Sequence, residues 1–177
     1  MNKKITKILN NSLLGIFIDD VEYEQQMDKT YSYIKSECFL LKFENDNCLT
    51  ITPLEIPQWK LKGELDIEFT RGINRFDENY DLSTAKCWEK FHKKKLVSIR
   101  QYYQIDNFLD RLVKGGKLVQ IEFIFENQNV FSLGFYRHND DEWSFIYSGE
   151  IGVTLNKSLN SAGGLSMKNK LLVRTLT

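Results

Sequence analysis

The chain has 177 residues, of which 42% are apolar and 13% aromatic, and its 24 basic residues are balanced by 24 acidic ones. This length suits one domain with a substantial core, and the zero net charge excludes an overall electrostatic attraction to nucleic acid or to an anionic membrane. The aromatic content favours β-strands, because flat side chains fit the half-buried surface of a sheet.

The start of the chain combines a helical pattern with a strand pattern. Residues 3–14 carry apolar side chains at helical spacing, and Gly15 follows them as a natural C-terminal stop, which predicts a short amphipathic helix. Residues 15–24 then read as a strand. Basic and apolar residues near the start resemble a signal peptide only superficially, because Asp19 and Asp20 follow at once without a small-residue cleavage site.

A hairpin is predicted next. Residues 31–43 alternate as a strand, residues 44–47 (Glu-Asn-Asp-Asn) supply a turn, and residues 48–52 return as a second strand. Pro53 and Pro57 end that strand, because proline lacks the amide proton that a ladder needs.

The middle of the chain alternates between strands and predicted helices. Residues 63–69 (GELDIEF) alternate strictly, and the polar residues 71–82 read as a loop. A helix capped by Ser83 is predicted over residues 84–94, with Trp88 and Phe91 on its apolar side and Cys87 as a further candidate for that side. The remaining elements are a strand over 96–103, a short helix over 105–115, and strands over 117–126, 130–137, 142–148 and 150–155.

These elements predict an α+β fold, with a predominantly antiparallel sheet of hairpins or a meander and two or three short helices packed on it. Residues 1–155 form a single domain, and residues 156–177 a basic C-terminal tail that is partly flexible, although KLLVRTL would also suit a final edge strand. Residues 15–51 and 116–155 share a similar pattern. Either an internal duplication or the general similarity of hairpins explains it.

Few residues could carry catalysis or bind a metal. His92 and His138 are the only histidines, and three cysteines without CxxC spacing suit reduced thiols in a cytoplasm. No cofactor and no nucleic-acid or membrane partner is expected. The apolar runs are too short to span a bilayer, and we expect a cytoplasmic protein.

Acidic side chains form the more distinctive groups. Rows of carboxylates without basic neighbours, about 6.6–7 Å apart along a strand face, could meet a basic protein surface and speed its capture. A solvated strand face is the ordinary explanation of the same alternation. The residues expected to bind a partner are Asp19, Asp20, Glu22, Glu24, Glu64, Asp66, Glu68, Asp77 and Glu78.

The strand pattern of residues 15–51 and 96–155, with its repeated hairpins, short helices and final WSFIY strand, resembles the small α+β immunity proteins of bacterial polymorphic-toxin and contact-dependent inhibition systems. This resemblance implies a cytoplasmic antitoxin, not an enzyme, that neutralises one cognate toxin domain by direct binding. No functional residue carries over from the family, because the likeness rests on pattern and on no invariant motif.

Two other functions stay open. One is an enzyme or small-ligand domain with a pocket near residues 84–104, lined by Cys87, His92 and Tyr102 or Tyr103. The other is a structural or oligomerising module, for which an exposed apolar sheet face would be the sign. The sequence does not fix the oligomeric state.

Overall fold

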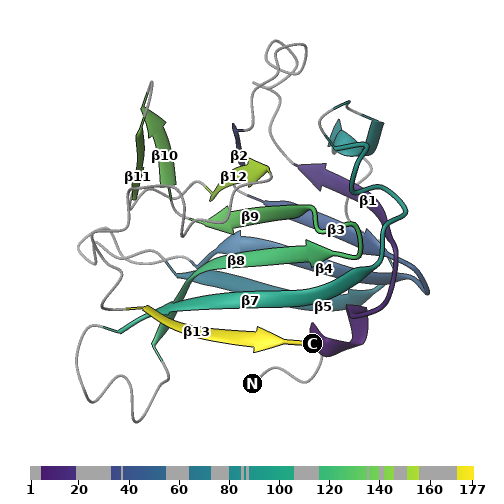
Figure 1. The fold of residues 1–177 in the computed structure, drawn as a ribbon, viewed down its shortest axis with the longest axis horizontal. Helices are drawn as coiled ribbons and strands as arrows, with labels where there is room; N and C mark the ends of the chain where they lie inside the picture. Colours follow the sequence, from purple (N-terminus) through teal and green to yellow (C-terminus); the bar gives the residue numbers. More distant parts are fainter. Residues whose placement is uncertain are drawn as a thin grey trace.

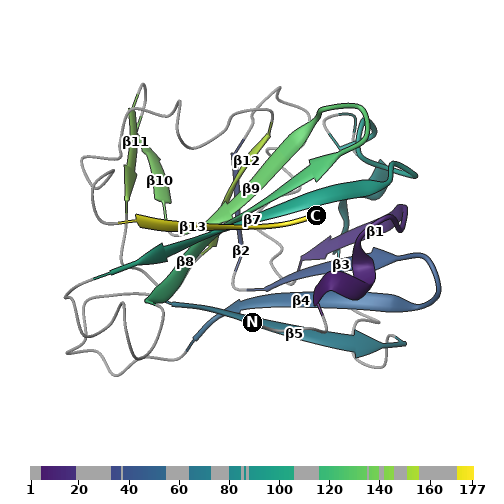
Figure 2. The same cartoon turned by 60° about the horizontal axis from the view of Figure 1, so that its bottom comes forward.

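The chain folds into two antiparallel sheets that stack face to face (Figures 1 and 2). The computed structural model describes residues 5–18, 33–36, 38–54, 64–72, 80–84, 86, 88–105, 116–134, 136–139, 142–145, 151–155 and 171–177.

The first sheet has five strands in the order β5-β4-β3-β1-β6. All its neighbouring strands are antiparallel. Its members are β1 (Leu13–Ile18), β3 (Phe39–Phe43), β4 (Asn47–Pro53), β5 (Leu65–Arg71) and β6 (Tyr80–Asp81).

The second sheet has six strands in the order β13-β7-β8-β9-β12-β2, also antiparallel throughout. A separate hairpin pairs β10 with β11. These strands are β2 (Tyr33–Ser36), β7 (Leu96–Gln104), β8 (Lys117–Phe125), β9 (Val130–Gly134), β10 (Tyr136–Asn139), β11 (Glu142–Phe145), β12 (Ile151–Leu155) and β13 (Leu171–Leu176).

The core lies between the two sheets. Alternate side chains of both sheets point into it, as in other face-to-face sheet packings. Phe131 on β9 is its aromatic centre, with ring centroids 4.8–5.6 Å from four other rings. Those four rings belong to Trp88, Phe91, Phe123 and Phe125.

The predicted α+β class is wrong, because the described residues contain no α-helix. Their only helical segments are two short 3₁₀ turns, η1 (Ile5–Ile8) and η2 (Leu82–Thr84). The helix predicted over residues 3–14 ends after η1, because the chain then enters β1 and pairs with β3. Gly15 therefore lies inside a strand. The helix predicted over 105–115 lies almost entirely outside the described residues.

The helix predicted over residues 84–94 is replaced by tight turns. The N–H of Phe91 donates to the carbonyl of Trp88, three residues back, at 2.9 Å. Lys93 adopts a positive φ of 58°, and its N–H donates to the carbonyl of Leu13 at 2.7 Å. Contacts with β1 thus override the local helical pattern. Ser83 caps no helix here, since its hydroxyl accepts the N–H of Ile16 at 3.0 Å.

Several predicted strands are confirmed and others divide. The turn over 44–47 is confirmed, with Asn45 and Asp46 both at positive φ, and β4 ends at Pro53. The single strand predicted over 31–43 is wrong, because β2 and β3 lie in different sheets. The strand predicted over 130–137 likewise divides into β9 and β10. Residues 171–176 form the edge strand β13, the alternative considered for the tail.

The first of the two similar stretches, residues 15–51, contains the antiparallel pair of β1 and β3, and the second, residues 116–155, contains the antiparallel pair of β8 and β9. In the first, Ile16 lies opposite Leu41, and in the second Ile121 lies opposite Leu133. The duplication stays a prediction.

Candidate functional site

The acidic side chains of β5 form the part of the predicted partner surface that the structure describes best. Asp66 and Glu68 are exposed, while Leu65, Ile67 and Phe69 point towards the core, so the predicted alternation is confirmed. Each acid lies opposite a half-buried threonine of β4. We call these four residues the β5 acidic face: Asp66, Glu68, Thr50 and Thr52.

Glu64 differs from the other two acids of this row. It precedes β5, is only half-exposed, and its charge acts on the hydroxyl of Tyr103 in the other sheet. The three carboxylates of the predicted row are therefore not equivalent. Asp66 and Glu68 form an exposed pair, whereas Glu64 is half-exposed and lies close enough to Tyr103 for its charge to act on it. The other predicted partner-binding residues lie outside the described part of the chain: Asp19, Asp20, Glu22, Glu24, Asp77 and Glu78.

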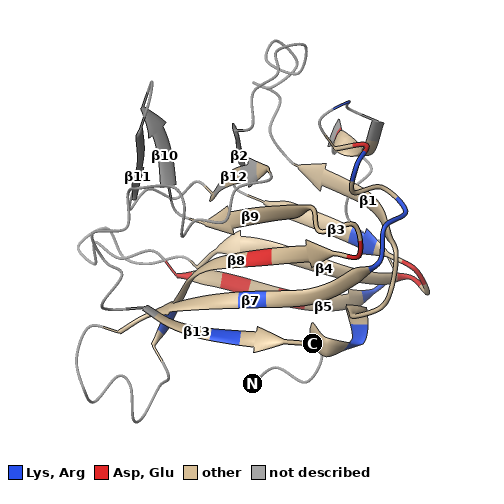
Figure 3. Ribbon diagram, in the orientation of Figure 1, with Lys and Arg blue, Asp and Glu red and all other residues tan. Residues whose placement is uncertain are grey.

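A second group of polar residues lies on the outer face of the six-stranded sheet, which the sequence did not single out. Arg100 of β7, Glu122 of β8 and Ser132 of β9 occupy one cross-strand row. Arg100 Nη1 lies 3.6 Å from Glu122 Oε2. In Figure 3, a blue segment of β7 lies beside a red segment of β8. The arginine side chain is 42% exposed, whereas the glutamate is completely buried.

The next cross-strand row on this face pairs Tyr102 with Gln120. Both side chains are buried. This group could not be predicted from the sequence. Glu122 alternates with Ile121 and Phe123, and such a pattern normally places the polar residue in solvent. Burial requires a charged group to be paired, and Arg100 provides an opposite charge.

Among the residues proposed to line an enzyme pocket, those that the structure describes do not all point to one side of the sheet. Tyr102 and Tyr103 are consecutive in β7 and point to opposite faces, Tyr103 towards the core and Tyr102 away from it. His92 lies in the turn before β7 and is half-exposed, and Cys87 lies outside the described residues. His138 lies in β10, and its side chain is not described.

Tyr103 belongs instead to a contact that holds the C-terminal strand. Its hydroxyl donates to Gln101 Oε1 at 3.0 Å, and the guanidinium of Arg174 on β13 lies 4.6 Å from its ring centroid. Burial raises the pKa of the Tyr103 hydroxyl, and the positive charge of Arg174 partly offsets this rise. This arrangement fits a structural contact, since a half-buried aromatic ring beside a cation stabilises the edge of the sheet.

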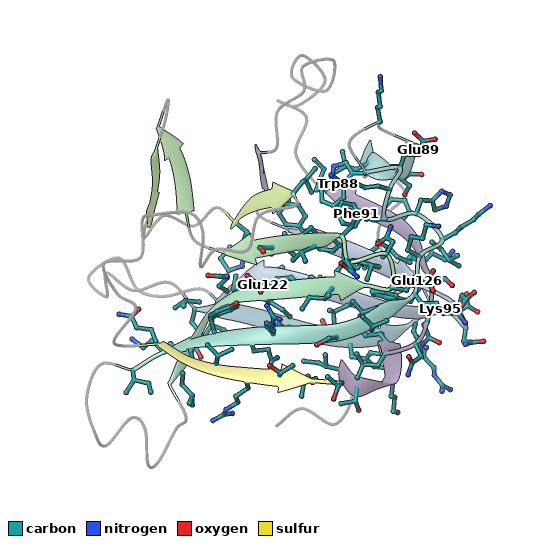
Figure 4. All side chains as sticks on the ribbon, in the orientation of Figure 1. Trp88, Glu89, Phe91, Lys95, Glu122 and Glu126 are labelled. Carbon is teal, nitrogen blue, oxygen red and sulfur yellow. The ribbon has the colours of Figure 1, made fainter. Side chains whose placement is uncertain are left out.

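Basic residues gather in the turn region that leads into β7. Lys86, Lys93 and Lys95 are exposed there, and Figure 4 shows Lys95 and Glu126 at the same end of the sandwich, where the N–H of Glu126 donates to the carbonyl of Lys95 at 2.9 Å. Glu89 and Glu126 are exposed in the same region. Charges of both signs are mixed here, so this surface resembles an ordinary solvated turn.

The described residues contain no group of three or more His, Cys, Asp or Glu side chains that could hold a metal ion. In the same part of the chain, no helix is long and apolar enough to cross a membrane. The large apolar side chains that are exposed in the described part of the chain come from four different segments: Leu14, Leu54, Val97 and Val173.

Comparisons of the chain with protein-family models, with curated proteins and with solved structures find no match.

Proposed function

We propose that the chain is a binding protein that captures a basic protein surface with its β5 acidic face, and that its partner is a toxin domain that it neutralises. The observation that carries this proposal is the exposure of Asp66 and Glu68 side by side on an edge strand. Two carboxylates with hydroxyl neighbours offer acceptors to lysine and arginine side chains, and charge complementarity of this kind accelerates association.

The toxin as partner derives from the pattern resemblance to immunity proteins. The short α-helices that this resemblance implies are absent from the described residues. The proposal therefore rests on the acidic surface, and the identity of the partner must come from experiment.

The proposal predicts that a toxin domain is encoded beside the gene for this chain, and the test uses that domain. Cells that produce this toxin domain are expected to grow when they also produce the wild-type chain, and to stop growing when Asp66 and Glu68 are both changed to lysine. The matched control changes Glu89 and Glu126 to lysine, which gives the same change in net charge at exposed positions in turns. Protection by the control and not by the β5 variant supports the proposal.

Equal protection by both variants would remove the β5 acidic face as the binding surface. If even the wild-type chain gives no protection and does not bind the purified toxin domain, the proposed partner is wrong. Folding of each variant is checked first by its urea unfolding transition, so that loss of protection is not mistaken for loss of the fold.

A further inference from the structure

β5 lies at the edge of its sheet. It is seven residues long and pairs with β4, and no other described strand pairs with it. Figure 2 shows β5 as the outermost labelled strand on its side of the sandwich. An edge strand presents a row of backbone N–H and C=O groups that can pair with another extended chain.

The two faces of β5 differ in a way that defines what could pair with it. Asp66 and Glu68 point outwards, while Ile67 and Phe69 point inwards but are only half-buried. The inward residues of the neighbouring strand, such as Ile51, are completely buried. An added strand would therefore cover apolar surface on one side and meet two carboxylates on the other.

We infer that β5 accepts an extended segment of the partner as an additional strand, in which basic side chains lie beside Asp66 and Glu68 and apolar side chains lie beside Ile67 and Phe69. This inference rests on the proposed function and specifies how the partner is recognised. Main-chain hydrogen bonds supply affinity in such strand addition, and alternate side chains supply specificity. Opposite charges at neighbouring cross-strand positions stabilise the pairing.

A second copy of the chain is a poorer occupant of the same edge. If β5 paired with β5 of another copy, their outward faces would bring Asp66 and Glu68 of one copy beside the same acids of the other. Like charges at neighbouring cross-strand positions destabilise a sheet. The charge of β5 thus favours a basic partner segment over self-association.

The test uses three synthetic seven-residue peptides and the full chain. The first alternates lysine with valine or isoleucine, the second has the same composition with its lysines grouped at one end, and the third is the alternating peptide with every second backbone amide N-methylated. The alternating peptide is expected to bind at least about tenfold more tightly than either control, because only it combines the side-chain pattern with free amides. Its binding should also slow hydrogen exchange of the β5 backbone amides.

The variant with Asp66 and Glu68 changed to lysine is expected not to bind the alternating peptide. The variant with Glu89 and Glu126 changed to lysine is expected to bind it as the wild type does. Equal affinity for the methylated peptide, or binding that leaves exchange in β5 unchanged, overturns strand addition. Dimerisation of the chain through β5, measured by sedimentation, also overturns it.

The two proposals fail separately. If the toxin domain loses affinity for the lysine variant while β5 gains no exchange protection from it or from the peptide, the acidic face binds the partner without adding a strand. If the peptide pairs with β5 but the toxin domain does not bind the chain, strand addition stands and the toxin is the wrong partner.

Discussion

Arg100 covers the buried carboxylate of Glu122, with Nη1 of the arginine 3.6 Å from Oε2 of the glutamate on the outer face of the six-stranded sheet. The glutamate has lost its contact with water, whereas the arginine keeps part of its own. Loss of Arg100 should therefore lower the stability of the fold more than loss of Glu122, because it leaves a buried charge without the opposite charge of the arginine, which is strongly unfavourable.

Changing Arg100 to alanine should lower the free energy of unfolding by roughly 2–4 kcal/mol, since it leaves a buried carboxylate without its opposite charge. Adding Glu122→Gln to this variant should restore part of the loss by removing the charge. Urea unfolding measures both effects, with Arg71→Ala, at an exposed position of β5, as the control. A cost for Arg100→Ala no larger than that of the control would contradict the role of this pair.

Glu44 predicts a pH dependence of stability. Its carboxylate accepts the backbone N–H of Ser12 at 2.9 Å. Hydrogen bonds from the backbone and from the side chain of Ser12 hold the pKa of Glu44 below its ordinary value of 4.5. Because the folded pKa is the lower one, the stabilisation is present above pH 4.5 and is lost as the pH falls through the folded pKa.

The difference in urea midpoint between the wild type and Glu44→Gln should therefore be largest at neutral pH and shrink below pH 4.5. Comparing two chains that differ only at this residue cancels the other carboxylates to a first approximation. A difference that stays constant from pH 7 to pH 3 would show that the Glu44 charge does not stabilise the contact with Ser12.

Substitution of Phe131 tests whether this residue is the aromatic centre of the core. Its side chain is completely buried, so Phe131→Ala should cost about 3–5 kcal/mol through lost burial and the cavity that remains. The half-buried Phe17 serves as the comparison, for which alanine should cost roughly 1–2 kcal/mol. Denaturant unfolding followed by circular dichroism measures both values, and equal costs would mean that the core is not centred on Phe131.

Two glycines with similar backbone angles allow the cost of a strained backbone to be distinguished from the cost of a steric clash. Gly116 has φ of 83° and Gly72 has φ of 78°, so a side chain is unfavourable at either position. A Cβ atom at Gly116 would lie 2.7 Å from the carbonyl oxygen of Gln104, whereas one at Gly72 would meet nothing within 4 Å. Alanine at Gly72 should cost about 1 kcal/mol, the ordinary left-handed penalty.

Gly116→Ala should cost clearly more than Gly72→Ala, because the ends of β7 and β8 must also move apart. The comparison needs only the urea midpoints and slopes of the two variants. Indistinguishable losses of stability would argue against the close approach of Gly116 to β7.

The sequence predicted local features of the fold better than long-range ones. Alternation along β5 and the Asn45–Asp46 turn depend on neighbouring residues, and both are confirmed. The helix expected over residues 84–94 failed because the end of this segment hydrogen-bonds to β1: Lys93 donates to, and Lys94 accepts from, the backbone of Leu13, more than seventy residues earlier. Nothing in the local pattern signals such a partner.

The candidate site shows the same division. The exposure of Asp66 and Glu68 followed from their alternation with apolar residues. The same rule failed for Glu122, because burial of both faces of β8 depends on tertiary packing, and alternation alone does not indicate it. The separation of residues 33–36 and 39–43 into different sheets was equally invisible, since two short strands joined by a brief connection read as one.

The most direct test of the central proposal is the equilibrium affinity of the purified chain for a cognate toxin domain, which the proposal expects to be encoded beside the gene for this chain. We expect that changing Asp66 and Glu68 to lysine weakens binding at least about tenfold, and that added salt weakens the wild-type complex more than the variant complex. The variant with Glu89 and Glu126 changed to lysine should bind like the wild type. Equal affinities for all three chains at every salt concentration would contradict the assignment of the β5 acidic face as the binding surface.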